Sequence, residues 1–154
     1  MNTLTVGDKA PQFTLLDQNG SEVALDSFKG RKVLIYFYPR ASTPGCTVQA
    51  CALRDSKSEL DALNVVVLGI SPDTPKKLTN FINKQELNFT LLSDEDHATC
   101  EAYNVWQLKK FMGRESMGVV RTSFLIDEDG NLEHIFNKFK TKDHHEVVLD
   151  FIKN

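Results

Sequence analysis

One stretch of the sequence, Lys32–Tyr38, most constrains the fold, because it is a nearly unbroken apolar run rich in β-branched and aromatic residues. Such a run is typical of a β-strand that is covered on both faces. Pro39 ends the run, and a second run of the same kind follows at Asn64–Ile70. The apolar spacing between the two predicts a helix from about Gly45 to Leu63. Two buried strands joined by a helix indicate an α/β sheet.

The rest of the chain continues this alternation of strands and helices. The predicted elements are a hairpin of Phe13–Leu16 and Glu22–Leu25 around Asn19-Gly20, a helix that begins at Ser71–Thr74, a strand at Phe89–Leu92, a helix at Asp94–Tyr103, a loop or helical turn at Trp106–Met117, a second hairpin of Val119–Ile126 and Leu132–Phe139, and a closing helix at His144–Ile152. We therefore expect an α/β fold with a central mixed sheet, helices on both faces and an N-terminal hairpin extension. Residues 1–154 are expected to form one domain.

Composition excludes several classes of function. The net charge is −3, with both signs scattered along the 154 residues, so nothing in the bulk charge attracts nucleic acid or an anionic membrane. The sequence has no apolar stretch near the roughly 20 residues that a bilayer span needs, and its start lacks the regions of a secretion signal. We expect a cytosolic protein. Three cysteines, an odd number, argue against a structural disulfide framework and for redox or metal chemistry.

Cys46 is the strongest candidate for a reactive group. It falls in the first turn of the helix that follows the first buried strand. There the unpaired backbone N–H groups and the positive end of the helix dipole favour a thiolate over a thiol. Gly45 lets the backbone approach whatever binds, and the hydroxyl of Thr43 can both donate and accept a hydrogen bond.

Arg121 is the candidate cation of the same site. It stands midway through the apolar run Val119–Ile126, where a charge is costly unless it has a partner such as a neighbouring thiolate. When a thiolate attacks a peroxide, charge builds on the departing oxygen, and fixed donors must already be aimed at it. Backbone N–H groups, Thr43 and Arg121 are of the right kind to supply them.

The spacing of Cys46 and Cys51 restricts how they can react with each other. Residues five apart on one helix lie about 8 to 9 Å apart at Cα, beyond the roughly 7 Å limit for a disulfide without backbone movement. Condensation of Cys51 with an oxidised Cys46 therefore requires local unwinding of the helix. The spacing also differs from the Cys-x-x-Cys pair of ordinary dithiol oxidoreductases.

The sequence resembles the peroxiredoxins, and within them the bacterioferritin comigratory protein group, or Q-type peroxiredoxins. The family pattern Pro-x-x-x-Thr-x-x-Cys stands as Pro39, Thr43 and Cys46, and the group's continuation as Thr43-Pro-Gly-Cys46-Thr and Cys51. The family's arginine matches Arg121. The resemblance extends from Gly7–Pro11 into the closing helix, and so covers nearly the whole chain. One departure is Arg40-Ala-Ser42, where many relatives carry acidic residues.

The resemblance implies a thioredoxin-like fold and an antioxidant thiol peroxidase that reduces hydrogen peroxide and organic hydroperoxides. It implies that Cys46 is the peroxidatic and Cys51 the resolving cysteine within one monomer, and that thioredoxin, or glutaredoxin, reduces the disulfide. Catalysis is expected to involve Cys46, Cys51, Thr43, Arg121 and Pro39, with the hydroperoxide bound by Thr43, Gly45, Cys46 and Arg121. No metal or cofactor is expected.

Other interpretations of these residues remain open. Thr43 could only cap its helix, Arg121 could be a surface residue of an edge strand, and Cys100 is expected to be packing, with a lesser possibility of a backup resolving thiol. The four histidines show no zinc-binding spacing. The rival functions are a disulfide oxidoreductase that never meets peroxide and a redox-sensing binding module. The missing Cys-x-x-Cys pair, with Thr43 and Arg121 present, counts against the first rival. Rapid catalytic turnover of peroxide would separate the second from a peroxidase.

Overall fold

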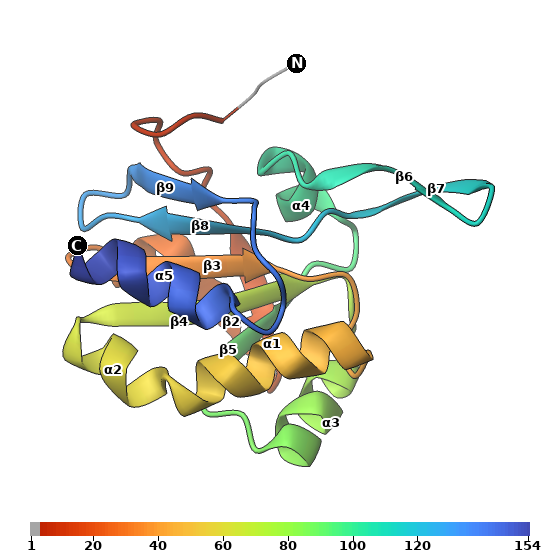
Figure 1. The fold of residues 1–154 in the computed structure, drawn as a ribbon, viewed down its shortest axis with the longest axis horizontal. Coiled ribbons are helices and arrows are strands. Elements are labelled where there is room, and N and C mark those ends of the chain that lie inside the picture. Colours follow the sequence, from red (N-terminus) through yellow and green to blue (C-terminus); the bar gives the residue numbers. More distant parts are fainter. Residues whose placement is uncertain (1–3) are drawn as a thin grey trace.

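A seven-stranded sheet of order β2-β1-β5-β4-β3-β8-β9 forms the centre of the protein (Figure 1). This computed structural model describes residues 4–154. The strands of the sheet are β1 (Thr14–Asp17), β2 (Glu22–Ala24), β3 (Lys32–Phe37), β4 (Val65–Ser71), β5 (Thr90–Ser93), β8 (Thr122–Ile126) and β9 (Leu132–Phe136). Strands β3, β4 and β5 are parallel, and the outer strands pair antiparallel, so the sheet is mixed as predicted.

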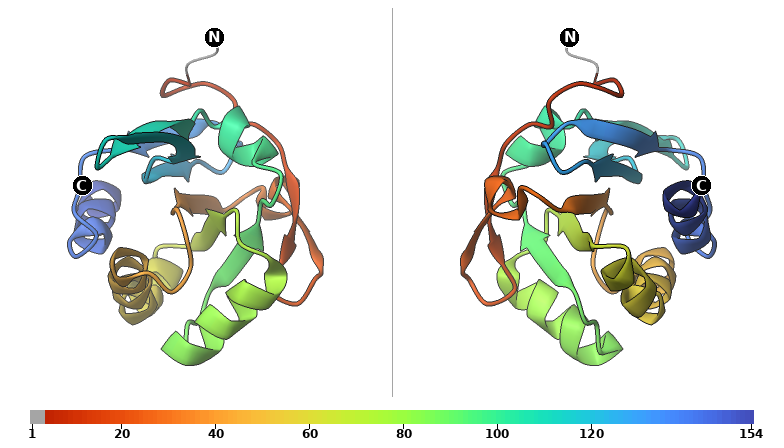
Figure 2. Two further views of the ribbon diagram at one scale, coloured as in Figure 1. Left: turned by 90° about the vertical axis from the view of Figure 1, so that its right-hand side faces the viewer. Right: turned by 90° about the vertical axis from the view of Figure 1, so that its left-hand side faces the viewer.

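Helices cover both faces of this sheet (Figure 2). They are η1 (Leu25–Phe28), α1 (Pro44–Asp55), α2 (Lys57–Ala62), α3 (Pro75–Gln85), α4 (Ala98–Ala102) and α5 (His144–Lys153). Alternate residues of β3 face opposite sides: Leu34 and Tyr36 pack with α1, α2, α3 and α5, whereas Ile35 and Phe37 pack with α4 and η1. Both faces of β3 are therefore buried, which explains its unbroken apolar sequence.

The opening hairpin forms around the predicted turn. The carboxylate of Asp17 accepts hydrogen bonds from the N–H groups of Asn19 and Ser21, at 2.9 and 3.0 Å. This hairpin is more than an appended extension, because Leu16 and Asp17 also pair with β5. It thus forms one edge of the main sheet.

The expectation of a loop or helical turn at Trp106–Met117 is wrong. Strands β6 (Trp106–Phe111) and β7 (Arg114–Val119) form a separate two-stranded hairpin, which projects beyond the end of the main sheet (Figure 1). Met112 and Gly113 make its turn with φ angles of 52° and 79°. Two central residues with positive φ are what a tight hairpin turn requires.

Helix boundaries also differ from the prediction. The expected helix from Gly45 to Leu63 is two helices, because it breaks at the buried Ser56 between α1 and α2. The helix expected at Asp94–Tyr103 is limited to α4, because the Asp94 carboxylate accepts hydrogen bonds from the N–H groups of Thr99 and Cys100. Asp94 therefore lies before this helix and satisfies its first free donors.

Candidate active site

Cys46 lies where the start of α1 meets the carboxyl end of the central strand β3. Thr43 precedes the helix in an extended conformation, and Pro44 opens it. The first helical hydrogen bond runs from the N–H of Thr47 to the carbonyl of Thr43, at 2.9 Å. The N–H groups of Gly45 and Cys46 precede that bond and have no helical acceptor. The Cys46 side chain, only 1% exposed, is thus held at the positive end of α1.

Arg121 contacts Cys46, but from a different place than expected. Strand β7 ends at Val119 and β8 begins at Thr122, so Arg121 lies in the link between them and not in the middle of a strand. Its Nη2 lies 3.3 Å from the Sγ of Cys46. A half-buried guanidinium thus faces the sulfur and can stabilise negative charge on it.

Gln49 is a site residue that sequence reasoning missed. Its Oε1 accepts a hydrogen bond of 2.6 Å from Nη1 of Arg121, and its side chain is fully buried. Gln49 follows Cys46 by three residues on α1, so the two side chains share one face of the helix. That spacing, next to a cysteine already suspected of reactivity, was the available signal.

Thr43 and Gly45 lie just before Cys46 at the start of α1. The hydroxyl of Thr43 donates to the carbonyl of Arg40 at 2.9 Å and makes no side-chain cap bond, so its oxygen remains able to accept a hydrogen bond. A Cβ built on Gly45 would lie 3.5 Å from Nη2 of Arg121. The helix backbone therefore passes next to the guanidinium. Pro39 stands one residue beyond the buried Tyr38 and lines a neighbouring groove.

Cys51 lies on α1 with Cys46, and both are free thiols. The side chain of Cys51 is half-buried, and its Sγ donates to Oε1 of Gln85 on α3 at 3.5 Å. The next turn of α1 is also tied to α3, because Nη1 of Arg54 donates to the carbonyl of Gln85 at 2.6 Å. While α1 is folded, helix geometry holds the two sulfurs apart.

A buried polar cluster lies in the core behind Arg121. The Nε2 of His144 is 2.7 Å from the hydroxyl of Ser123, and both side chains are fully buried. Burial lowers the pKa of His144 to about 3, with further lowering by His145 and Arg121. Burial likewise raises the pKa of Tyr36 well above its ordinary value. His144 and Tyr36 are therefore neutral at physiological pH.

Cys100 lies away from this site. It packs with Phe37 and Tyr103 on the opposite face of the sheet from the cluster that contains Cys46. Burial raises the pKa of its thiol, so this sulfur stays protonated at neutral pH. Among residues 4–154 there is no group of three or more His, Cys, Asp or Glu side chains placed to hold a metal ion. Within the same range, no helix is long and apolar enough to cross a bilayer.

A buried cysteine at a helix start, faced by an arginine on an α/β sheet, is the arrangement expected of a thiol-dependent oxidoreductase. A family model described as the AhpC/TSA family matches residues 6–135, so the chain belongs to that family. A relative from Haemophilus influenzae is 62% identical over all of this chain and 99% of its own length. Peroxiredoxin Bcp of Escherichia coli is 58% identical over 99% of this chain and 98% of its own.

Solved structures agree with these sequence relatives. A bacterioferritin comigratory protein from Xanthomonas campestris, studied for its alkyl peroxide reduction activity, matches with a TM-score of 0.86 and 33% identity over 92% of this chain and 90% of its own. A mutant of PrxQ from Xylella fastidiosa matches with a TM-score of 0.93 and 26% identity over 99% and 98%. The thioredoxin-like fold is thus confirmed, and the protein is a peroxiredoxin with thiol peroxidase activity.

Proposed function

We propose that Cys46 is the peroxidatic cysteine of this enzyme and that Cys51 resolves it within the same chain. The observation that carries the proposal is the fork of Arg121, which donates to the Cys46 sulfur at 3.3 Å and to Gln49 at 2.6 Å. A guanidinium fixed beside the sulfur is already aimed at the position where negative charge develops during the reaction. This supports hydrogen peroxide and organic hydroperoxides as substrates.

The first step of the proposed cycle forms an S–O bond and breaks the O–O bond. The thiolate of Cys46 attacks the terminal oxygen of the hydroperoxide and becomes a sulfenic acid, while the other oxygen takes a proton from solvent and leaves as water or alcohol. The free N–H groups of Gly45 and Cys46 and the guanidinium of Arg121 serve as donors to the substrate oxygens. Thr43 accepts from the hydroperoxide O–H, since its own proton is engaged by Arg40. Pro39 holds the loop beside them.

In the second step the sulfur of Cys51 attacks the sulfenic sulfur of Cys46, and the sulfenic hydroxyl leaves as water with the proton of the Cys51 thiol. Local unwinding of α1 precedes this bond, since the two cysteines are five positions apart on one helix. A dithiol protein then reduces the disulfide. We propose thioredoxin for that role, with glutaredoxin as the alternative. We also propose one domain over residues 1–154, a monomeric enzyme, and a cytosolic location.

The cycle is tested by NADPH consumption through thioredoxin and its reductase with a hydroperoxide as substrate. Cys46→Ser is expected to abolish activity, because the attacking sulfur is gone. Cys51→Ser should show one fast oxidation and then stall. Cys100 cannot rescue that variant, because the sheet separates it from Cys46, and Cys100→Ser should keep full activity. Sustained turnover of the Cys51→Ser enzyme under these conditions would contradict the proposed resolving role.

A further inference from the structure

Cations surround the start of α1. The exposed side chains of Arg40, Lys77, Lys109 and Lys110 border a groove beside it. Two more exposed cations, Lys140 and Lys142, flank Thr141, whose methyl carbon lies 3.7 Å from a Cβ built on Gly45. The chain as a whole carries a net charge of −3, so this concentration of positive charge is local.

The acidic residues at this surface are already engaged. The carboxylate of Asp73 accepts hydrogen bonds from the N–H of Ala41 at 2.7 Å and from the hydroxyl of Ser71 at 2.8 Å. Glu115 pairs with Lys110 at 3.3 Å. Four cations line the groove against one carboxylate, and Glu115 offsets only one of the four, so the surface presents mainly positive charge to an approaching molecule.

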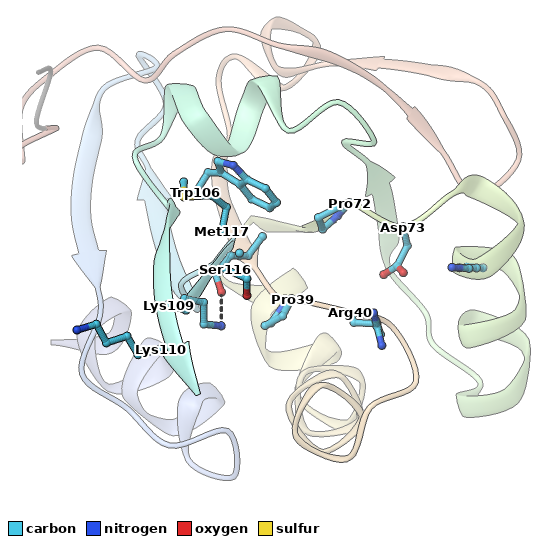
Figure 3. Close-up of a pocket in the computed structure, with 12 residues that line it drawn as sticks. Pro39, Arg40, Pro72, Asp73, Trp106, Lys109, Lys110, Ser116 and Met117 are labelled. Carbon is cyan, nitrogen blue, oxygen red and sulfur yellow. Dashed lines mark hydrogen bonds between the residues drawn. The ribbon is translucent and has the colours of Figure 1, made fainter. Parts of the chain in front are cut away.

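The groove itself is broad and partly apolar. It has a volume of about 540 Å³ and lies between the β6–β7 hairpin on one side and the segments Pro39–Arg40 and Pro72–Asp73 on the other (Figure 3). Trp106, Met117 and Val119 contribute apolar wall on the hairpin side. A second hollow of about 380 Å³ shares Arg40, Asp73 and Lys77 and extends along Ala41 and Ser42. Together the two hollows offer more volume than a small peroxide needs.

Neither sulfur of the proposed cycle lines these hollows. Cys46 is 1% exposed, and Cys51 faces α3. A macromolecule can therefore reach a disulfide between them only after α1 has unwound. The residues that unwind follow directly on Pro39–Ser42, so the disulfide is displayed next to the grooved surface.

We propose that this surface docks the dithiol protein that reduces the disulfide, and that this partner carries acidic residues around its thiols. The inference rests on the proposed function. Trp, Met and Arg side chains together are typical of protein interfaces, and the surrounding cations complement an acidic rim. One partner thiolate attacks the Cys46–Cys51 disulfide and forms a mixed disulfide with one of the two cysteines. The second partner thiol then attacks the partner's own sulfur in that bond and releases the peroxidase cysteine. Two electrons and two protons pass to the peroxidase, and the partner leaves as its own disulfide.

The test compares two double variants with the same change in net charge. Lys77→Glu with Lys110→Glu reverses charge at the docking surface. Lys9→Glu with Lys29→Glu is the matched control, because those lysines border a separate hollow near the start of β3. Hydroperoxide turnover is supported either by an acidic thioredoxin with its reductase or by dithiothreitol, at low and at high salt. The small reductant needs no docking surface.

We expect the surface variant to lose about 10-fold in kcat/KM for thioredoxin at low salt. The loss should shrink at high salt, where charges are screened. Turnover with dithiothreitol should be unchanged, and the control variant should resemble the wild type in both assays. An unchanged thioredoxin reaction, or an equal loss in both double variants, would overturn the inference. Slower turnover of a carboxylate-bearing hydroperoxide by the surface variant, with dithiothreitol as the reductant, would also overturn the inference. The groove would then bind the substrate and not the protein partner. Failure of the wild type to turn over with dithiothreitol would instead contradict the proposed peroxidase cycle.

Discussion

Arg121 acts on the sulfur only if its guanidinium keeps one orientation, and Gln49 supplies that constraint. The two terminal nitrogens of the Arg121 guanidinium donate separately, one to Cys46 and one to Gln49. Because Cys46 and Gln49 both belong to α1, the position of the cation depends on the folded helix. Gln49 is thus a positioning residue, which acts on the peroxide reaction through Arg121.

We expect Gln49→Leu to lower the second-order rate constant for oxidation of Cys46 by about 10-fold, the equivalent of about 1.4 kcal/mol. The physical reason is that Nη1 of Arg121 loses its acceptor and the fork is no longer fixed. Stopped-flow mixing with hydrogen peroxide measures this rate.

An Arg121→Met background provides the control for this prediction. There the additional Gln49→Leu change should have little further effect, because the residue through which Gln49 acts is absent. If the two changes lowered the rate independently, the positioning role of Gln49 would be excluded.

At the scale of elements, α1 must be stable enough to hold Cys46 and weak enough to unwind. Val48 lies between the two cysteines and is 46% exposed, so substitutions there change the stability of the helix with little loss of packing. Alanine and glycine differ by about 1 kcal/mol in helix propensity. We expect disulfide formation to be about fivefold faster in Val48→Gly than in Val48→Ala.

The slow phase after oxidation by one equivalent of peroxide measures this difference. The fast phase, which reports attack by Cys46, should be similar in the two variants and serves as the internal control. Equal slow phases would indicate that the unwinding of α1 does not limit the resolving step.

The elements that the sequence predicted are those whose burial or capping depends on neighbouring residues in the chain. Strands β3 and β4 are buried on both faces and leave unbroken apolar runs. Helix α3 is capped by Thr74, whose hydroxyl accepts from the N–H of Lys77 at 3.3 Å. The β6–β7 hairpin leaves no such pattern, because most of its residues are exposed. The break at Ser56 was also invisible, since apolar spacing continues from Leu53 to Leu60 without a glycine or proline.

The candidate site divides in the same way. Thr43, Cys46 and Cys51 lie within nine residues, so one local motif contains them. Arg121 stood out by its charge in an apolar run, but its place between β7 and β8 depends on how the hairpin joins the sheet. Its bond to Gln49 spans 72 residues, and no local pattern could have predicted it.

At the scale of the whole molecule, His144 joins the last helix to the sheet. It stands at the first residue of α5 and bonds to Ser123 on β8 at 2.7 Å. Its pKa is about 3 in the folded protein, against about 6.5 in an unfolded chain. Between those values the unfolded chain binds the extra proton, so the free energy of unfolding falls as the pH falls below 6.5.

We expect this residue to cost the folded state about 2 kcal/mol between pH 7 and pH 5. His144→Gln, which keeps a partner for Ser123 but cannot titrate, should flatten the pH dependence by that amount. Urea denaturation of both proteins at several pH values checks it. Parallel stability curves would show that His144 can be protonated without loss of the fold.

The short break at Ser56 has a consequence for the endurance of the enzyme. Helix α2 begins directly after it, with Leu60 in the core and Glu59 paired with Lys153 on α5 at 2.7 Å. We expect a rearrangement that starts at Cys46 to end at this break, because Leu60 and the Glu59–Lys153 pair hold α2 in place. Each round of chemistry can loosen and rebuild about three turns of chain. Helix α2 and strand β4 then stay folded through each cycle, which suits an enzyme that repeats the same reaction many times.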